Sequence, residues 1–153
     1  MFADLLADLP VVGSGAFWWS EIDAGVPTVF PATQEKFVPQ MINLEVVGGV
    51  SFSKGCYPGQ EVVARSQYRG KLKRRMQLAH CAASAPAGAD VFAAGDTEPA
   101  GTVVMAASAP DGGFDLLIEC PLEKTGAPLR LGSAEGPALA LRTLPYELVD
   151  VTA

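Results

Sequence analysis

The chain has 153 residues, of which 49% are hydrophobic and 18% are charged, and its formal net charge is −6. These values exclude a disordered chain and argue against a dedicated nucleic-acid binder, and no apolar run is long enough to predict a membrane-spanning helix. The first ten residues, MFADLLADLP, contain no basic residue and do not resemble a signal peptide, so we expect a cytoplasmic protein.

The part of the chain before Gly70 predicts short helical pieces rather than a sheet. Apolar residues at helical spacing predict a helix over 14–25, with Ser14 as a candidate cap. Two further helical segments are predicted, one over 34–45 with an interruption at Pro39 and one over 59–70. We therefore expect a mixed, largely helical segment over residues 1–70.

The part after Gly70 predicts strands separated by Gly, Pro and Asp turns. Residues 109–113, APDGG, are typical of a hairpin connection. No parallel β-α-β rhythm is present, so the interpretation is an α+β chain whose residues 71–148 form a small antiparallel β-barrel. Five or six strands are expected, within the segments 72–81, 89–95, 100–109, 113–122, 128–132 and 137–146.

Six of the eleven basic residues fall between positions 65 and 75, on an otherwise acidic chain. This cluster predicts either a local positive patch, which could contact tRNA, or a solvated strand edge protected by its charges. In the first strand we expect Leu72, Met76 and Leu78 to face the core. The residues expected on the exposed basic surface are Arg65, Arg69, Lys71, Lys73 and Arg75.

The three cysteines form no CxxC pair, and their spacing matches no zinc site, so no metal site is expected within the chain. Cys81 and Cys120 lie in apolar strand segments and should be buried small residues. His80 is the only histidine, and no carboxylate or hydroxyl near it in sequence suggests a catalytic triad. We interpret it as an ordinary strand histidine.

Cys56 has a different setting, within the segment SFSKGCYPGQE at residues 51–61. Turn-forming residues surround it, and it directly precedes the predicted helix over 59–70, whose free amide groups favour a thiolate. The positive charge of Lys54 acts in the same direction, whereas Glu61 in the first turn suits the helix dipole. The pattern predicts a reactive or metal-ligating thiol at Cys56.

The segment KGCYPGQE resembles the signature K-G-C-Y-[TP]-G-Q-E of the YgfZ family of folate-binding, iron–sulfur-associated proteins. The similarity extends from about Glu21 to Met76 and is weaker but compatible up to Tyr146. The residues of this sequence that match the motif are Lys54, Gly55, Cys56, Tyr57, Gly59, Gln60 and Glu61.

This resemblance implies a function and a ligand. The family is homologous to the T-protein (aminomethyltransferase) of the glycine cleavage system, so residues 1–70 would be the end of a folate-binding domain. Tetrahydrofolate is the implied cofactor, with Trp18 and Asp23 as contacts, although Trp19 or Phe17 could replace Trp18. The implied role is that of an accessory factor for iron–sulfur proteins, including tRNA-modifying enzymes, or for their assembly machinery. Cys56 would carry it, with Lys54 beside it.

Two other functions remain open at this point. One is a folate-dependent one-carbon transferase like the T-protein, and the other is a module that docks a protein or tRNA. Because family members are about twice this length, we also expect exposed apolar surface around Phe17, Trp18 and Trp19, and hence self-association. Of the two adjacent tryptophans, one should pack in the core while the other could line a ligand pocket.

Overall fold

The computed structural model describes residues 11–52, 54–55, 61 and 72–148. The described part of the chain begins with helix α2 (Ser14–Asp23) and two 3-10 helices, η1 (Pro31–Thr33) and η2 (Pro39–Ile42). Six strands follow, with a third 3-10 helix, η3 (Leu122–Lys124), between the fourth and the fifth. The strands are β1 (Arg74–Cys81), β2 (Asp90–Ala93), β3 (Gly101–Ser108), β4 (Phe114–Pro121), β5 (Leu129–Leu131) and β6 (Ala138–Arg142).

The six strands form a closed barrel in the order β1-β4-β3-β2-β5-β6, with β6 pairing back onto β1, and every pair is antiparallel. This confirms the predicted barrel, with a strand in each of the six expected segments. Residues 109–113 connect β3 to β4, as their turn chemistry predicts. The expected domain boundary at Gly70 lies outside the described residues, and the relation of the preceding segment to a T-protein-like domain stays a prediction.

The barrel wall separates two hydrophobic cores. On β1, Ala79 and Cys81 point into the barrel, whereas Met76 and Leu78 belong to a second core outside it. This alternation follows from the two-residue period of a strand. On β3 a register shift between Val103 and Met105 interrupts the alternation, so that Val104 and Met105 both reach the outer core while Val103 stays inside.

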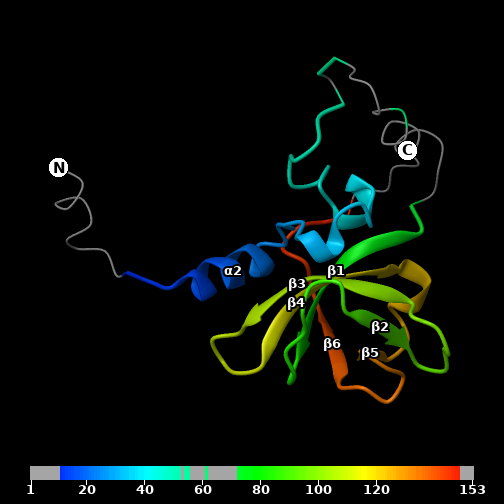
Figure 1. Ribbon diagram of the computed structural model, residues 1–153. Coiled ribbons are helices and arrows are strands. Elements are labelled where there is room, and N and C mark those ends of the chain that lie inside the picture. Colours follow the sequence, from blue (N-terminus) through cyan, green and yellow to red (C-terminus); the bar gives the residue numbers. More distant parts are fainter. Residues whose placement is uncertain (1–10, 53, 56–60, 62–71, 149–153) are drawn as a thin grey trace.

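The segment that precedes the barrel covers the outer core (Figure 1). Ile22 of α2 and Ile42 of η2 are fully buried there. Trp18 packs edge to face against Phe30, with ring centroids 5.5 Å apart. Trp18 is thus the tryptophan of the pair that packs against the core.

Helix α2 differs from the prediction at its start and agrees with it at its end. The N-cap is Gly13 and no side chain caps the helix, so the assignment of Ser14 as the cap was wrong. After the C-cap Ala24, Gly25 adopts a φ of +67°, which is the left-handed conformation typical of a residue following a helix. The Tyr146 hydroxyl donates to the Gly25 carbonyl at 2.7 Å and ties this end of α2 to the chain beyond β6.

Arg75 does not belong to an exposed basic surface, and this expectation was wrong. Its side chain is buried, pairs with Glu45 and donates to the Gln40 carbonyl at 2.9 Å. By the two-residue period of β1, Arg75 lies on the same face as Ala79 and Cys81, which point into the barrel, rather than on a solvent face. The segment around η2 supplies the partners of its charge. Lys73 is exposed, whereas Arg65, Arg69 and Lys71 lie outside the described residues.

Exposed apolar side chains gather at the start of the described chain. Val11 is 93% exposed, Val12 68% and Phe17 53%, whereas Trp18 and Trp19 are half-buried. Self-association through this surface stays a prediction. Within the described ranges, no helix combines the length and the apolar character needed to cross a membrane.

Candidate functional site

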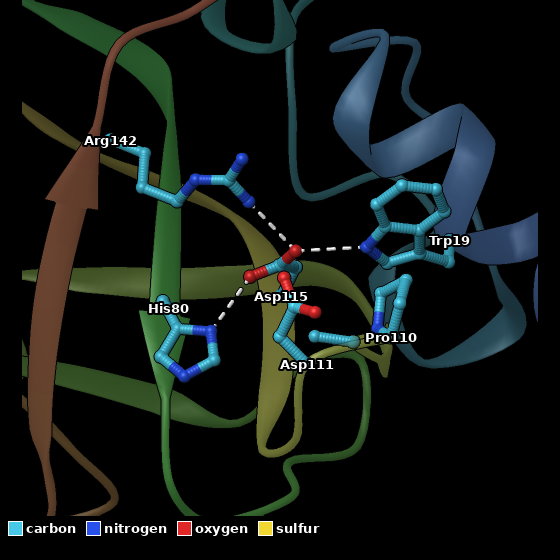
Figure 2. A pocket seen from close by; sticks show the side chains of 7 residues that line it. Trp19, His80, Pro110, Asp111, Asp115 and Arg142 are labelled. Carbon is cyan, nitrogen blue, oxygen red and sulfur yellow. Dashed lines mark hydrogen bonds and ion pairs between the residues drawn. The ribbon is translucent and has the colours of Figure 1, made fainter.

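Asp115, at the start of β4, gathers side chains from three other elements (Figure 2). The indole Nε1–H of Trp19, on α2, donates to Oδ2 at 2.9 Å. Arg142 Nη1, at the end of β6, donates to the same oxygen at 2.7 Å. His80 Nδ1, on β1, lies 2.8 Å from Oδ1. Residues far apart in the sequence therefore converge on one carboxylate.

The carboxylate of Asp115 is held in its charged form. Its side chain is only 3% exposed, and this burial alone would raise its pKa. The hydrogen bonds from His80 and Trp19, together with the charge and hydrogen bond of Arg142, outweigh burial and hold the pKa below the ordinary value of 3.8. An ionised carboxylate accepts hydrogen bonds only, so Asp115 selects the form of His80 that carries a proton on Nδ1.

The local sequence explains why these groups can meet. His80 and Asp115 are register partners in the β1–β4 pair. Two residues before Asp115, Gly113 has a φ of +69°, and a Cβ on it would approach both His80 Nε2 and the Cys81 carbonyl to 2.8 Å. Only glycine allows this turn to pass so close to the imidazole. The pair Gly112-Gly113 therefore supports the site as well as the hairpin.

Replacing Gly113 with alanine should test this close approach. We expect Gly113→Ala to lower the free energy of unfolding by about 1–2 kcal/mol more than Gly132→Ala does, because overpacking adds to left-handed strain. Gly132 is the matched control, since its φ is +77° and nothing lies within 4 Å of a Cβ placed on it. Urea unfolding of both variants measures this difference. Equal losses of unfolding free energy would show that the close approach of Gly113 to His80 does not require glycine.

A cavity of about 380 Å³ opens beside Asp115. It lies between α2, the barrel and the β3–β4 hairpin (Figure 2). Trp19, Ala109 and Pro110 provide largely apolar surface, while charged or polar groups provide the rest. The complete lining is Trp19, His80, Ala109, Pro110, Asp111, Asp115 and Arg142.

The two residues predicted to contact folate lie apart. Trp18 packs against the outer core, and it is Trp19 that lines the cavity. Asp23 is half-exposed and forms an ion pair with Arg142 Nη2 at 3.3 Å. Asp23 follows Trp18 by five positions, which places the two about 140° apart around the axis of α2. The structure thus brings Asp23 toward the Asp115 cluster and leaves Trp18 outside it.

The two cysteines that the structure describes are buried, as the sequence predicts. Cys81 and Cys120 are free and buried. Burial, reinforced by the charge of Glu119, raises the pKa of the Cys120 thiol to about 11. Cys56 lies outside the described residues, as do Tyr57, Gly59 and Gln60 of the motif, whereas Lys54, Gly55 and Glu61 are exposed. Among the described residues, no three histidine, cysteine or acidic side chains gather as metal ligands.

Asp115 and Arg142 are site residues that the sequence did not predict. One sequence feature does point to Asp115, because it is a charged residue near the start of a largely apolar strand, GFDLLIEC. The sequence could not predict that His80 contacts Asp115, because β1 and β4 become neighbours only when the barrel forms. His80 therefore has the carboxylate partner that its sequence neighbours do not supply, 35 residues further along the chain.

Comparison with known proteins gives a consistent set of relatives. No family model matches the chain. It is 39% identical over 135 residues to a protein named tRNA-modifying protein YgfZ from Klebsiella pneumoniae, a match that covers 84% of this chain and 41% of that protein. Its identity to the protein of the same name from Pectobacterium atrosepticum is 38% over 137 residues, covering 85% and 40% respectively.

A shorter segment is more similar still. Over 66 residues, or 42% of this chain and 20% of the relative, it is 50% identical to the tRNA-modifying protein YgfZ of Vibrio atlanticus. The chain spans about two fifths of the length of the longer-matching curated relatives. These matches agree with the KGCYPGQE segment, and the chain belongs to the YgfZ family, of which it matches the C-terminal part.

Proposed function

We propose that this chain acts in the cytoplasm as a folate-linked accessory factor for the assembly or maintenance of iron–sulfur proteins, including enzymes that modify tRNA. The observation that carries the proposal is its 36–39% identity, over most of its length, to proteins named tRNA-modifying protein YgfZ. The KGCYPGQE segment supports it, since this octapeptide includes the cysteine on which the proposed function depends.

Cys56 is the residue proposed to act. The other two cysteines are buried in the barrel interior, where they have no access to a partner, and burial raises the pKa of the Cys120 thiol to about 11. Lys54, Gly55 and Glu61, which flank the motif positions outside the described residues, are exposed. A surface segment with a cationic side chain two residues before the thiol suits reaction with, or metal transfer to, another protein.

The described residues fit tetrahydrofolate only in part. The half-exposed carboxylate of Asp23 can accept N–H groups of a pterin ring, but Trp18 uses its ring for packing against Phe30. When bound, tetrahydrofolate supplies a carrier for one-carbon groups. We propose that Asp23 contributes one edge of a folate site whose other walls are not among the described residues, and no step of the proposed function is derived through the cofactor.

Any contact with tRNA cannot include Arg75, because that side chain is buried and paired. On the described part of β1 and the residues before it, Lys73 is the exposed cation of the predicted set. We propose that the link to tRNA runs through client enzymes that modify it. Direct contact through Arg65, Arg69 and Lys71, which lie outside the described residues, stays a prediction.

The test is a Cys56→Ser variant in bacteria that lack their own YgfZ gene. We expect the wild-type chain, supplied with whatever preceding segment its gene encodes, to restore the tRNA modifications made by iron–sulfur enzymes, and the variant to leave them at the level of the deletion strain. Modified nucleosides are measured by mass spectrometry of digested tRNA. Cys81→Ala is the control, because it removes a buried thiol and should restore modification; full activity of Cys56→Ser would contradict the proposal.

A further inference from the structure

The cavity beside Asp115 is a second place on this chain with the features of a binding site, and its chemistry does not depend on Cys56. It is concave, it lies where α2 meets the barrel, and it combines apolar walls with fixed polar groups. Asp115 is positioned by three hydrogen-bonding partners, so the polar side of the cavity is already organised without a ligand.

The charges around the cavity favour a cation. Asp111 and Asp115 line it, and Asp23 lies at its border through Arg142. Against these three carboxylates the site has one guanidinium, which already donates to both Asp115 and Asp23. Asp111 forms no ion pair with any residue that the structure describes. The uncompensated charge is therefore negative, and it lies at the hairpin end of the cavity.

The apolar residues that line the cavity favour an organic cation. The indole of Trp19 and the ring of Pro110 face the same space as Asp111 (Figure 2). An indole attracts a cation through its negative ring face and also packs well against an apolar body. A volume of about 380 Å³ accommodates a small organic molecule with room to spare for water.

Two other ligand classes fit less well. An anion would have to bind Arg142, whose two terminal nitrogens already donate to carboxylates, and it would meet the charge of Asp111. A metal ion would need several free ligands, but both oxygens of Asp115 accept hydrogen bonds, and the described residues contain no group of three ligating side chains.

We propose that this cavity binds a small organic ammonium ion, with the charged group at Asp111 and the apolar body against Trp19 and Pro110. Asp115 does not pair with the ligand directly. It positions Trp19, His80 and Arg142, which form the surrounding walls.

The chain offers a convenient reporter, because His80 is its only histidine and lines the cavity. The experiment titrates the ¹⁵N-labelled chain with benzylammonium chloride at a fixed, slightly alkaline pH and follows the imidazole nitrogen signals. We expect a saturable shift of these signals. Benzyl alcohol and benzoate, which keep the ring but remove or reverse the charge, should produce no saturable shift in the same concentration range.

Two variants locate the charge that binds. Asp111→Asn should weaken benzylammonium binding about three- to fivefold, the range for an exposed ion pair. Glu123→Gln removes the same charge from η3, which follows the opposite end of β4, and should leave binding unchanged. The proposal is overturned if benzylammonium gives no saturable shift, if benzoate shifts His80 equally, or if the two variants bind alike.

Discussion

Replacing Asp115 with alanine is expected to lower the free energy of unfolding by about 2–4 kcal/mol, a large part of the stability of an ordinary domain. The substitution leaves the Trp19 indole N–H, the His80 imidazole and Arg142 without their common acceptor. Because His80 and Arg142 are about two fifths exposed, water replaces part of what they lose, which keeps the expected cost below that of a fully buried pair. Thermal unfolding should shift by roughly 5–15 °C.

The matched control is Asp96→Ala. Asp96 pairs with Lys124 at 2.9 Å, but both side chains are about one third exposed, so this loss should stay within about 1 kcal/mol. Equal destabilisation by the two substitutions would mean that the Asp115 cluster does not hold α2 to the barrel.

The stabilisation from Asp115 should also depend on pH in a defined direction. Because the pKa of Asp115 is lower in the folded chain than its ordinary value of 3.8, its contribution is complete above that value and is lost as the pH falls through the lowered pKa. The difference in unfolding free energy between the wild type and Asp115→Asn should therefore narrow below about pH 4. A constant difference down to pH 2 would contradict the assignment.

The barrel could be predicted from the sequence because its signals are local. Each strand shows alternation or an apolar run, and the turn at residues 109–113 identifies a hairpin without any knowledge of the rest of the fold. The same local logic placed Cys81 and Cys120 inside apolar strands, and the structure confirms that both are buried.

What could not be predicted depends on contacts between distant segments. Arg75 alternates with apolar residues and so resembles an exposed strand position, yet the segment around η2 supplies Glu45 and the Gln40 carbonyl to receive it. Asp115 depends on strand order in the same way, since β1, β4 and β6 become neighbours only through barrel closure. Periodicity shows which side of a strand a residue occupies, but not which element covers that side.

Cys56 is expected to react with iodoacetamide at least about 20-fold faster than Cys120 at pH 7. A thiol whose pKa is about 11, as for Cys120, is ionised about 300-fold less at this pH than one at the free-thiol value of about 8.5. The thiolate of the less acidic thiol is the stronger nucleophile, and this offsets a factor of roughly ten of the difference in thiolate population. The burial of Cys120 slows its reaction further. If Lys54 and a helix start lower the pKa of Cys56, its thiolate population at neutral pH rises and its reaction is faster still.

The rates are measured by timed alkylation of the folded chain, digestion and mass spectrometry of the three cysteine peptides. The pH dependence of the Cys56 rate should give an apparent pKa below about 8.5. In guanidinium chloride all three thiols should react at similar rates, which controls for the peptides themselves. Cys81, buried on the inner face of β1, should follow Cys120 and react slowly in the folded chain. If Cys56 reacts no faster than Cys81 there, the thiol at the centre of KGCYPGQE is not activated, and the proposed role of Cys56 as a reactive thiolate is wrong.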